Sequence, residues 1–332
     1  MQIRNDVRHP VARPACVLAV AMTMLAGCAP SASERSVNLN PVNGVGANLR
    51  QMLEAVNGRS SSPSARRSRL RVDLTPPELY VSDAENGFVD VYSLKTRSLV
   101  GQIAANHPTG LATDLHNNLY VANLGGGNVT VYALGQTQPS LTLTDPGARP
   151  DAVAVGTDGT VYVADENGAV YLYPTGATQS TSSLSNAAVE SASAVAVDAA
   201  NDVYVAGYNH VGNGEVVEYA QARGSGVNLQ LRGLEGPAGI ALDRRRRIVL
   251  ADLLMPGISV FKHNATTAYR VFAQSGNPNR FAFNRTKSRV YVPMTSSDVN
   301  IYDYKSGALI GTLIGPSGSV MIGAAMIPAP QN

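Results

Sequence analysis

Residues 119–132 read LYVANLGGGNVTVY, in which an apolar run and an alternating run flank a glycine-rich connection. Two runs rich in β-branched and aromatic residues around such a connection predict a β-hairpin. The first run recurs as an apolar residue, then usually Tyr-Val-Ala, then Asp or Asn. Its six copies are residues 79–83, 119–123, 161–165, 203–207, 248–252 and 290–294. Their second positions are 40, 42, 42, 45 and 42 residues apart. A sustained period of this length with strand signals indicates a propeller or a solenoid.

Each period has room for four strands. A short apolar strand precedes every copy after the first, at residues 110–113, 152–155, 194–197, 239–242 and 280–283. A tight turn such as Asp158-Gly159 joins it to the motif strand, and alternating runs such as 128–132 and 140–143 supply the third and fourth strands.

The two ends of the repeat region decide between a ring and a solenoid. The first copy has no inner strand before it, whereas residues 319–324 resemble an inner strand with no copy after it. The number of inner strands equals the number of motif strands in complete blades only if the C-terminal strand belongs to the first blade. This closure also protects sheet edges from aggregation. We therefore predict an all-β fold, a six-bladed β-propeller of four-stranded antiparallel blades closed by the C-terminal strand.

The repeat resembles those of the NHL and YVTN propeller families, through residues 119–123 together with the strand at 129–132. The resemblance covers about residues 79–325 and implies that ligands bind at the top face. The top face collects the links between blades and the loop after each motif strand, and the bottom face collects the other turns. The resemblance does not name an activity, because one propeller scaffold hosts many functions. We interpret the recurring tyrosines as packing between blades.

The N-terminus has the features of a lipoprotein leader. Three arginines precede an apolar run at residues 15–24, which is shorter than the roughly 20 residues that span a bilayer and fits a signal peptide. Residues 25–28 read LAGC and resemble a bacterial lipobox, which implies cleavage before Cys28 and acylation of that cysteine. The alternative is ordinary secretion, with cleavage near Ala29 or Ala32 and Cys28 unmodified.

We predict three segments: a lipoprotein signal peptide over residues 1–27, a flexible basic tether with lipidated Cys28 over residues 28–72, and the propeller over residues 73–332. Ala29, rather than Asp, follows the cysteine. By resemblance to Gram-negative sorting, this permits the outer membrane. We therefore expect a lipid-anchored protein of the bacterial envelope, in the outer membrane, with the side of that membrane left open.

Charge and cysteine content exclude several classes. Residues 28–72 carry seven Arg against two Glu, whereas residues 73–332 carry 16 basic and 21 acidic side chains. A mildly acidic globule does not concentrate positive charge as nucleic-acid-binding domains do, so we expect no nucleic acid partner. Both cysteines, Cys16 and Cys28, lie near the N-terminus, so the propeller has no thiol for a disulfide, a metal site or a nucleophile.

The two faces differ in charge. The top-face loops carry many acidic side chains, and the bottom-face turns carry 12 of the 16 basic ones. The candidate ligand-binding residues of the top face are Asn123, Arg149, Asp165, His210, Asp252 and Arg280. The candidate membrane-facing basic patch of the bottom face is Arg244, Arg245, Arg246, Arg247, Arg285 and Lys287. The alternative for this patch is an ordinary solvated surface.

Binding is the function that the sequence favours. We predict an envelope-anchored binding or scaffold propeller that recognises a protein, peptide or glycan through its top-face loops, with no catalytic residue and no cofactor. Asp83, Asp165 and Asp252 stand at matching places and could converge on an axial Ca²⁺ or Mg²⁺, although Asp often serves turn hydrogen bonds there. Two alternatives stay open: a metal-dependent enzyme similar to gluconolactonase-like or streptogramin-lyase-like propellers, and an assembly scaffold without a small ligand.

Overall fold

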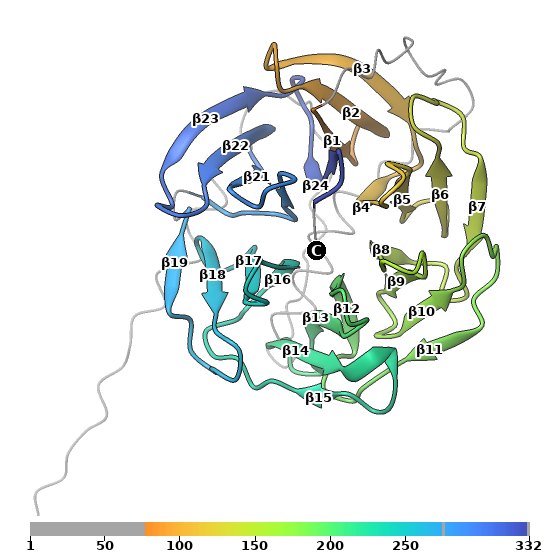
Figure 1. The fold of residues 1–332 in the computed structure, drawn as a ribbon, viewed down its shortest axis with the longest axis vertical. Helices are drawn as coiled ribbons and strands as arrows, with labels where there is room; N and C mark the ends of the chain where they lie inside the picture. Colours follow the sequence, from red (N-terminus) through yellow and green to blue (C-terminus); the bar gives the residue numbers. More distant parts are fainter. Residues whose placement is uncertain (1–76, 274–275, 331–332) are drawn as a thin grey trace, which may run out of the picture. The chain divides into compact units, whose positions relative to one another are not determined.

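The computed structural model describes residues 77–273 and 276–330. These residues form six four-stranded antiparallel sheets around a central axis (Figure 1), which confirms the predicted six-bladed β-propeller. The helical content of the described ranges is one short 3-10 turn, η1 (Ala220–Ala222). None of the described helical structure has the length and apolarity that a membrane span requires. The predicted signal peptide, the lipidation site Cys28 and the tether lie outside the described residues.

Each blade has four strands, counted outward from the axis. The inner strands are β4 (Pro108–Thr113), β8 (Pro150–Val155), β12 (Ser191–Val197), β16 (Pro237–Leu242), β20 (Ala282–Phe283) and β24 (Met321–Ile327). The second strands are β1 (Glu78–Asp83), β5 (Leu119–Asn123), β9 (Val161–Asp165), β13 (Val203–Tyr208), β17 (Ile248–Asp252) and β21 (Arg289–Pro293). The third strands are β2 (Phe88–Ser93), β6 (Asn128–Tyr132), β10 (Val170–Tyr173), β14 (Gly214–Tyr219), β18 (Ile258–Phe261) and β22 (Asp298–Asp303). The outer strands are β3 (Ser98–Ala104), β7 (Leu141–Thr144), β11 (Ser182–Leu184), β15 (Val227–Asn228), β19 (Arg270–Phe272) and β23 (Leu309–Ile314).

Blade 1 combines the two ends of the propeller. Its sheet has the order β24-β1-β2-β3, and blades 2 to 6 follow in chain order from β4 to β23. β24 pairs antiparallel with β1, with Leu79 opposite Met326 and Val81 opposite Ala324. The C-terminal strand therefore closes the ring as predicted. It begins at Met321 rather than at residue 319, because Ser319 and Val320 bind the loop after β1 instead.

Polar side chains at the end of β1 connect this closure to blade 2. The backbone N–H of Gly323 donates to Ser82 Oγ at 2.6 Å, and Ser82 Oγ donates to the Thr109 carbonyl at 2.6 Å. Asp83 accepts hydrogen bonds from Ser319 Oγ at 2.7 Å and from the Val320 N–H at 3.3 Å. A Cβ at residue 323 would lie 2.1 Å from the Thr109 carbonyl oxygen, so the close approach requires glycine.

The repeat tyrosines pack between neighbouring blades, as their recurrence predicts. Tyr120 of blade 2 lies in one buried cluster with Val153 and Val161 of blade 3. The equivalent tyrosines, Tyr80, Tyr162, Tyr204 and Tyr291, are at most 3% exposed. Such large rings cover the adjoining sheet and keep neighbouring blades in register.

We expect Ser82→Ala to destabilise the propeller by about 1–3 kcal/mol, because it leaves the Gly323 N–H and the Thr109 carbonyl without their shared partner. Ser98→Ala is the matched control, since Ser98 is exposed on the outer strand of the same blade. Urea unfolding measures both variants. Equal midpoints for the two would contradict the role assigned to Ser82.

Candidate functional site

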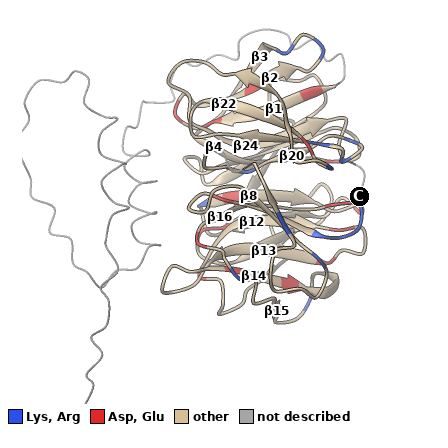
Figure 2. Cartoon of the chain, turned by 90° about the vertical axis from the view of Figure 1, so that its left-hand side faces the viewer, with Lys and Arg blue, Asp and Glu red and all other residues tan. Residues whose placement is uncertain are grey.

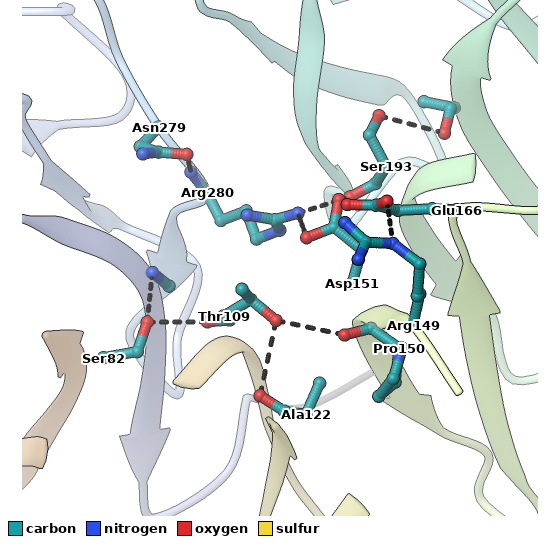
Figure 3. Close-up of polar contacts among 12 residues, drawn as sticks. Ser82, Thr109, Ala122, Arg149, Pro150, Asp151, Glu166, Ser193, Asn279 and Arg280 are labelled. Atoms are coloured by element: carbon teal, nitrogen blue, oxygen red, sulfur yellow. Dashed lines mark hydrogen bonds and ion pairs between the residues drawn. The ribbon is translucent and has the colours of Figure 1, made fainter. Parts of the chain in front are cut away.

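The inner strands run from the top face to the bottom face, and they meet closely at the top. A Cβ on Gly110 would lie 2.6 Å from Ala152 Cα in the next blade. Thr109 Oγ1 crosses the same boundary and donates to the Pro150 carbonyl at 3.3 Å (Figure 3). The small residues at the start of these strands thus let adjacent backbones approach until little space remains on the axis.

Arg280 fills the remaining space at the top of the axis. It lies on blade 6, two residues before Ala282. The equivalent position is Gly or Ala in the other blades. Its Nη2 pairs with Asp151 Oδ1 of blade 3 at 2.6 Å and donates to the Ser193 carbonyl of blade 4 at 2.9 Å (Figure 3). The side chain therefore crosses from one side of the ring to the other. We call Thr109, Asp151, Ser193 and Arg280 the axial plug.

The axial plug contains a largely buried ion pair between Arg280 and Asp151. The side chains of Arg280 and Asp151 are 12% and 16% exposed. Burial raises the pKa of Asp151 to about 6, and the Arg280 charge opposes this rise. Burial also raises the pKa of the nearby Tyr208, and the charges of Asp252 and Asp151 add to that effect. The top of the axis is thus filled by charges that neutralise each other.

Arg149 and Asp165, two predicted ligand-binding residues, lie in adjoining top-face loops of blade 3. Arg149 Nε pairs with Glu166 Oε2 at 2.5 Å. Asp165 accepts hydrogen bonds from the backbone N–H groups of Arg149 at 2.9 Å and Asn167 at 2.7 Å. Burial and the charge of Asp165 raise the pKa of Asp145, beside it, to about 8. Asp165 therefore holds its own loop and the preceding link.

Asn123 and Asp252 also bind their own surroundings. Asn123 is 2% exposed and donates through Nδ2 to Thr130 Oγ1 at 2.9 Å. Asp252 accepts from the backbone N–H groups of Glu235 and Gly236 at 2.9 and 2.8 Å. These contacts match the turn-forming use of Asp and Asn.

The three acids considered for an axial metal site bind local partners instead. Asp83, like Asp165 and Asp252, binds N–H groups of its own loop. Across residues 77–273 and 276–330, no three His, Cys, Asp or Glu side chains are placed to hold a metal ion. His210 is exposed at the tip of the loop after β13.

Three top-face segments of blades 4 and 5 pack against one another, and we call them the loop surface. It comprises the turn at residues 209–213, the link at 234–237 and the loop at 253–256. Gly214 and Gly236 leave space for close packing: a Cβ on Gly214 would lie 2.8 Å from Leu234 Cβ, and one on Gly236 would lie 2.8 Å from Leu254 Cγ. His210 was predicted from the sequence, whereas the loop at residues 253–256 was missed. The apolar run Leu253-Leu254-Met255 directly after a motif strand was its signal.

The predicted basic patch on the bottom face divides into three kinds of side chain. Basic segments gather on the side of the propeller where the chain ends (Figure 2). Arg246 Nη2 pairs with Asp198 at 2.5 Å, and Arg247 Nη2 pairs with Asp243 at 2.5 Å. Lys287 is buried. Arg244, Arg245 and Arg285 are exposed and belong to none of the ion pairs found in the described part of the chain.

A cavity of about 520 Å³ occupies the axis below the plug, and we call it the axial cavity. Its wall comes from the later residues of the inner strands, and its mouth lies among the bottom-face turns. This volume falls within the range of small-molecule sites, roughly 300–1,000 Å³. The candidate ligand-binding residues predicted from the sequence lie on the opposite face. The available signal was the small side chains of inner strands such as 152–155 and 194–197, which both read Ala-Val-Ala-Val and leave space on the axis.

Comparison with known proteins supports the fold. No family model and no curated protein matches the sequence. Among solved structures, a chain of the nidogen/laminin complex superposes with a TM-score of 0.64 at 14% identity, covering 77% of this chain and 100% of that chain. A chain of hydrazine synthase from Kuenenia stuttgartiensis superposes with a TM-score of 0.53 at 16% identity, covering 76% and 91%. The molecule is a six-bladed β-propeller. At these identities the likeness shows the fold alone.

We expect Arg280→Met to destabilise the propeller by about 3 kcal/mol at pH 7.5, because it leaves the Asp151 carboxylate buried without its partner. The pKa of Asp151 is already raised, so the folded state binds its proton more tightly than the unfolded chain. Loss of the Arg280 charge raises this pKa further, so the destabilisation should shrink as pH falls from 7.5 toward about 6 and should stay constant at lower pH. Urea unfolding at pH 7.5 and pH 5 measures it.

Asp151→Asn in the Arg280→Met background is the control for this prediction, since it removes the stranded charge and should restore part of the stability at pH 7.5. A loss from Arg280→Met that is the same at both pH values, and is not relieved by Asp151→Asn, would show that the ion pair is not what closes the axis.

Proposed function

We propose that this protein is a lipid-anchored binding propeller of the bacterial envelope that recognises a protein partner through the loop surface of blades 4 and 5. The observation that carries the proposal is the exposure of Val211 and Met255 on neighbouring, internally fixed loops. Their side chains are 48% and 37% exposed. Exposed apolar side chains within a polar rim are typical of the centre of a protein interface.

The loop surface is held in place before any partner binds. Asn209 Oδ1 accepts hydrogen bonds from the N–H groups of Val211 and Asn213 at 3.1 and 3.0 Å. Asp252 Oδ1 accepts from the N–H groups of Leu254 and Met255, both at 2.9 Å. Fixed loops lose less conformational entropy on association, so their apolar contacts contribute more fully to affinity.

The charge around the loop surface suggests the chemistry of the partner. Glu190 and Glu235 are exposed on the same face, in the links that lead into blades 4 and 5. A partner with an apolar centre and basic side chains around it would be complementary. The carboxylates of Asp83, Asp165 and Asp252 already bind loop N–H groups, which favours a structural role for them over an axial metal site.

Three further observations support the proposal. The Tyr-Val repeats resemble those of NHL and YVTN propellers, and a chain of similar fold occurs in a structure of the nidogen/laminin complex. The leader and its LAGC sequence support anchoring through Cys28. Exposed Arg244, Arg245 and Arg285 on the bottom face support an orientation with that face toward anionic lipid and the loop surface away from it.

Photocrosslinking in the native host tests the binding surface. We expect p-benzoylphenylalanine at position 211 or 255 to give a discrete protein adduct, because both side chains would lie inside the interface. The same probe at Val227, which is 66% exposed on the outer strand of blade 4, should give none. The double variant Val211→Asp with Met255→Asp should abolish an adduct formed from a probe at His210. Identical adduct patterns at 227 and at the two loop positions would contradict the proposal.

Fractionation tests the anchor. We expect the wild-type chain to sediment with membranes and Cys28→Ser to lose the lipid and stay at the precursor size, because acyl transfer requires the thiol. Cys16→Ser is the control, since that cysteine lies within the predicted leader. Metabolic labelling with a palmitate analogue and immunoblotting measure the outcome. Label that persists in Cys28→Ser would overturn the assignment.

A further inference from the structure

The axial cavity has an interior that suits hydrocarbon. All six inner strands contribute to its wall, through residues 111–113, 153–155, 195–197, 240–242, 281–283 and 324–326. Every one of these side chains is apolar except Thr113. Unpaired polar groups are costly to bury in such surroundings, so the wall disfavours sugars and peptide backbones.

The charged groups of the cavity lie at its mouth, and most of them are already paired. Asp198 pairs with Arg246, and Asp243 pairs with Arg247. Asp114 accepts hydrogen bonds from the Asn118 side chain at 2.7 Å and from its N–H at 2.8 Å. The cations that line the mouth beyond these pairs are Arg244, which is exposed, and Lys287.

Lys287 is a buried cation that has no anionic partner within ion-pair distance among the described residues. It is 9% exposed, and its Nζ donates to the Leu242 carbonyl at 2.9 Å. It belongs to none of the ion pairs found in the described ranges. Burial lowers the pKa of Lys287. The charge of Asp243 opposes this effect, but the two side chains are farther apart than an ion pair allows. An ammonium group desolvated in this way is unfavourable unless an opposite charge approaches it.

The backbone at Lys287 adds to this cost. Its φ is +46°, in the left-handed region. The equivalent residues are Asn117, Gly159 and Asn201 in blades 2, 3 and 4, which are residue types that tolerate this conformation, and Arg246 in blade 5, whose φ is +56°. Local backbone preference therefore does not explain a lysine here.

We infer that the axial cavity binds a single-chain amphiphile with an anionic head, such as a fatty carboxylate or an alkyl phosphate, with its hydrocarbon chain along the axis and its head at Lys287. The apolar wall contacts the hydrocarbon chain and the plug closes the far end. The anionic head supplies the opposite charge that Lys287 lacks, and Arg244 adds a second cation beside it. Ala329 and Pro330 complete part of the wall, and the Ala329 N–H donates to Asn117 Oδ1 at 3.1 Å. This site is on the face opposite the loop surface and does not depend on the function proposed for it.

Calorimetric titration of the full chain tests the site, with amphiphiles of equal chain length kept below their micellar concentrations. We expect saturable 1:1 binding of decanoate or decyl phosphate, with the tighter of the two identifying the head, and much weaker binding of decyltrimethylammonium. Lys287→Met keeps the aliphatic stem but removes the charge, so it should weaken binding of the anionic amphiphiles by about tenfold or more.

Arg285→Met is the matched control, because Arg285 is an exposed cation on the same turn and does not line the cavity. It should leave the affinity unchanged. Ala196→Phe, which fills the cavity, should abolish binding of all three amphiphiles. If Lys287→Met does not fold, this variant provides the test of the site. No saturable binding of either anionic amphiphile, equal affinity for decyltrimethylammonium, or unchanged anion affinity in Lys287→Met would each overturn the inference.

Discussion

The antiparallel pairing of β24 with β1 is the contact on which the rest of the propeller depends. It joins segments at opposite ends of the repeat region, and the hydrogen bond from Gly323 to Ser82 spans 241 residues. Bringing such distant segments together costs loop-closure entropy before any other blade contact can compensate for it. Once formed, the pairing removes two open sheet edges and fixes the position of blade 2 through the contact between Ser82 and Thr109. The geometry of the axis then follows from the register of this one pair of strands.

A closed ring with small inner-strand residues gives an axis with two unlike ends. At the top, glycines bring the strands together, and Arg280 and Asp151 close what remains. At the bottom, the strands diverge around an apolar cavity whose mouth holds the buried Lys287. The two ends therefore support different kinds of recognition. In the functions proposed for them, the filled top presents its loops to a protein partner and the hollow bottom takes a small amphiphile. Both faces belong to one rigid scaffold, so a ligand in the cavity contacts the inner strands that lead to the plug.

The repeat made the architecture predictable, because strands of one blade are close in sequence and each carries the same pattern. The tyrosines, the inner strands and the closing strand were all located within a few residues. The site was less predictable, because it depends on contacts across the axis. Nothing near Arg280 in sequence indicates that it reaches Asp151 and Ser193, which are 129 and 87 residues away. The acids at Asp165 and Asp252 matched a metal-site pattern, but local N–H groups use the same oxygens. The leader, the anchor and the membrane orientation stay predictions.

Native-state hydrogen exchange of the β24 amides tests the central claim most directly. If ring closure holds the propeller together, the amides of β24 that bond to β1 should exchange only by global unfolding. Their free energies of exchange should then equal those of β8 and β12, on the far side of the ring, and should fall in step with them as denaturant is added. If β24 exchanged through a separate low-energy opening while the other inner strands stayed protected, the ring would not depend on its C-terminal strand, and the account would be wrong.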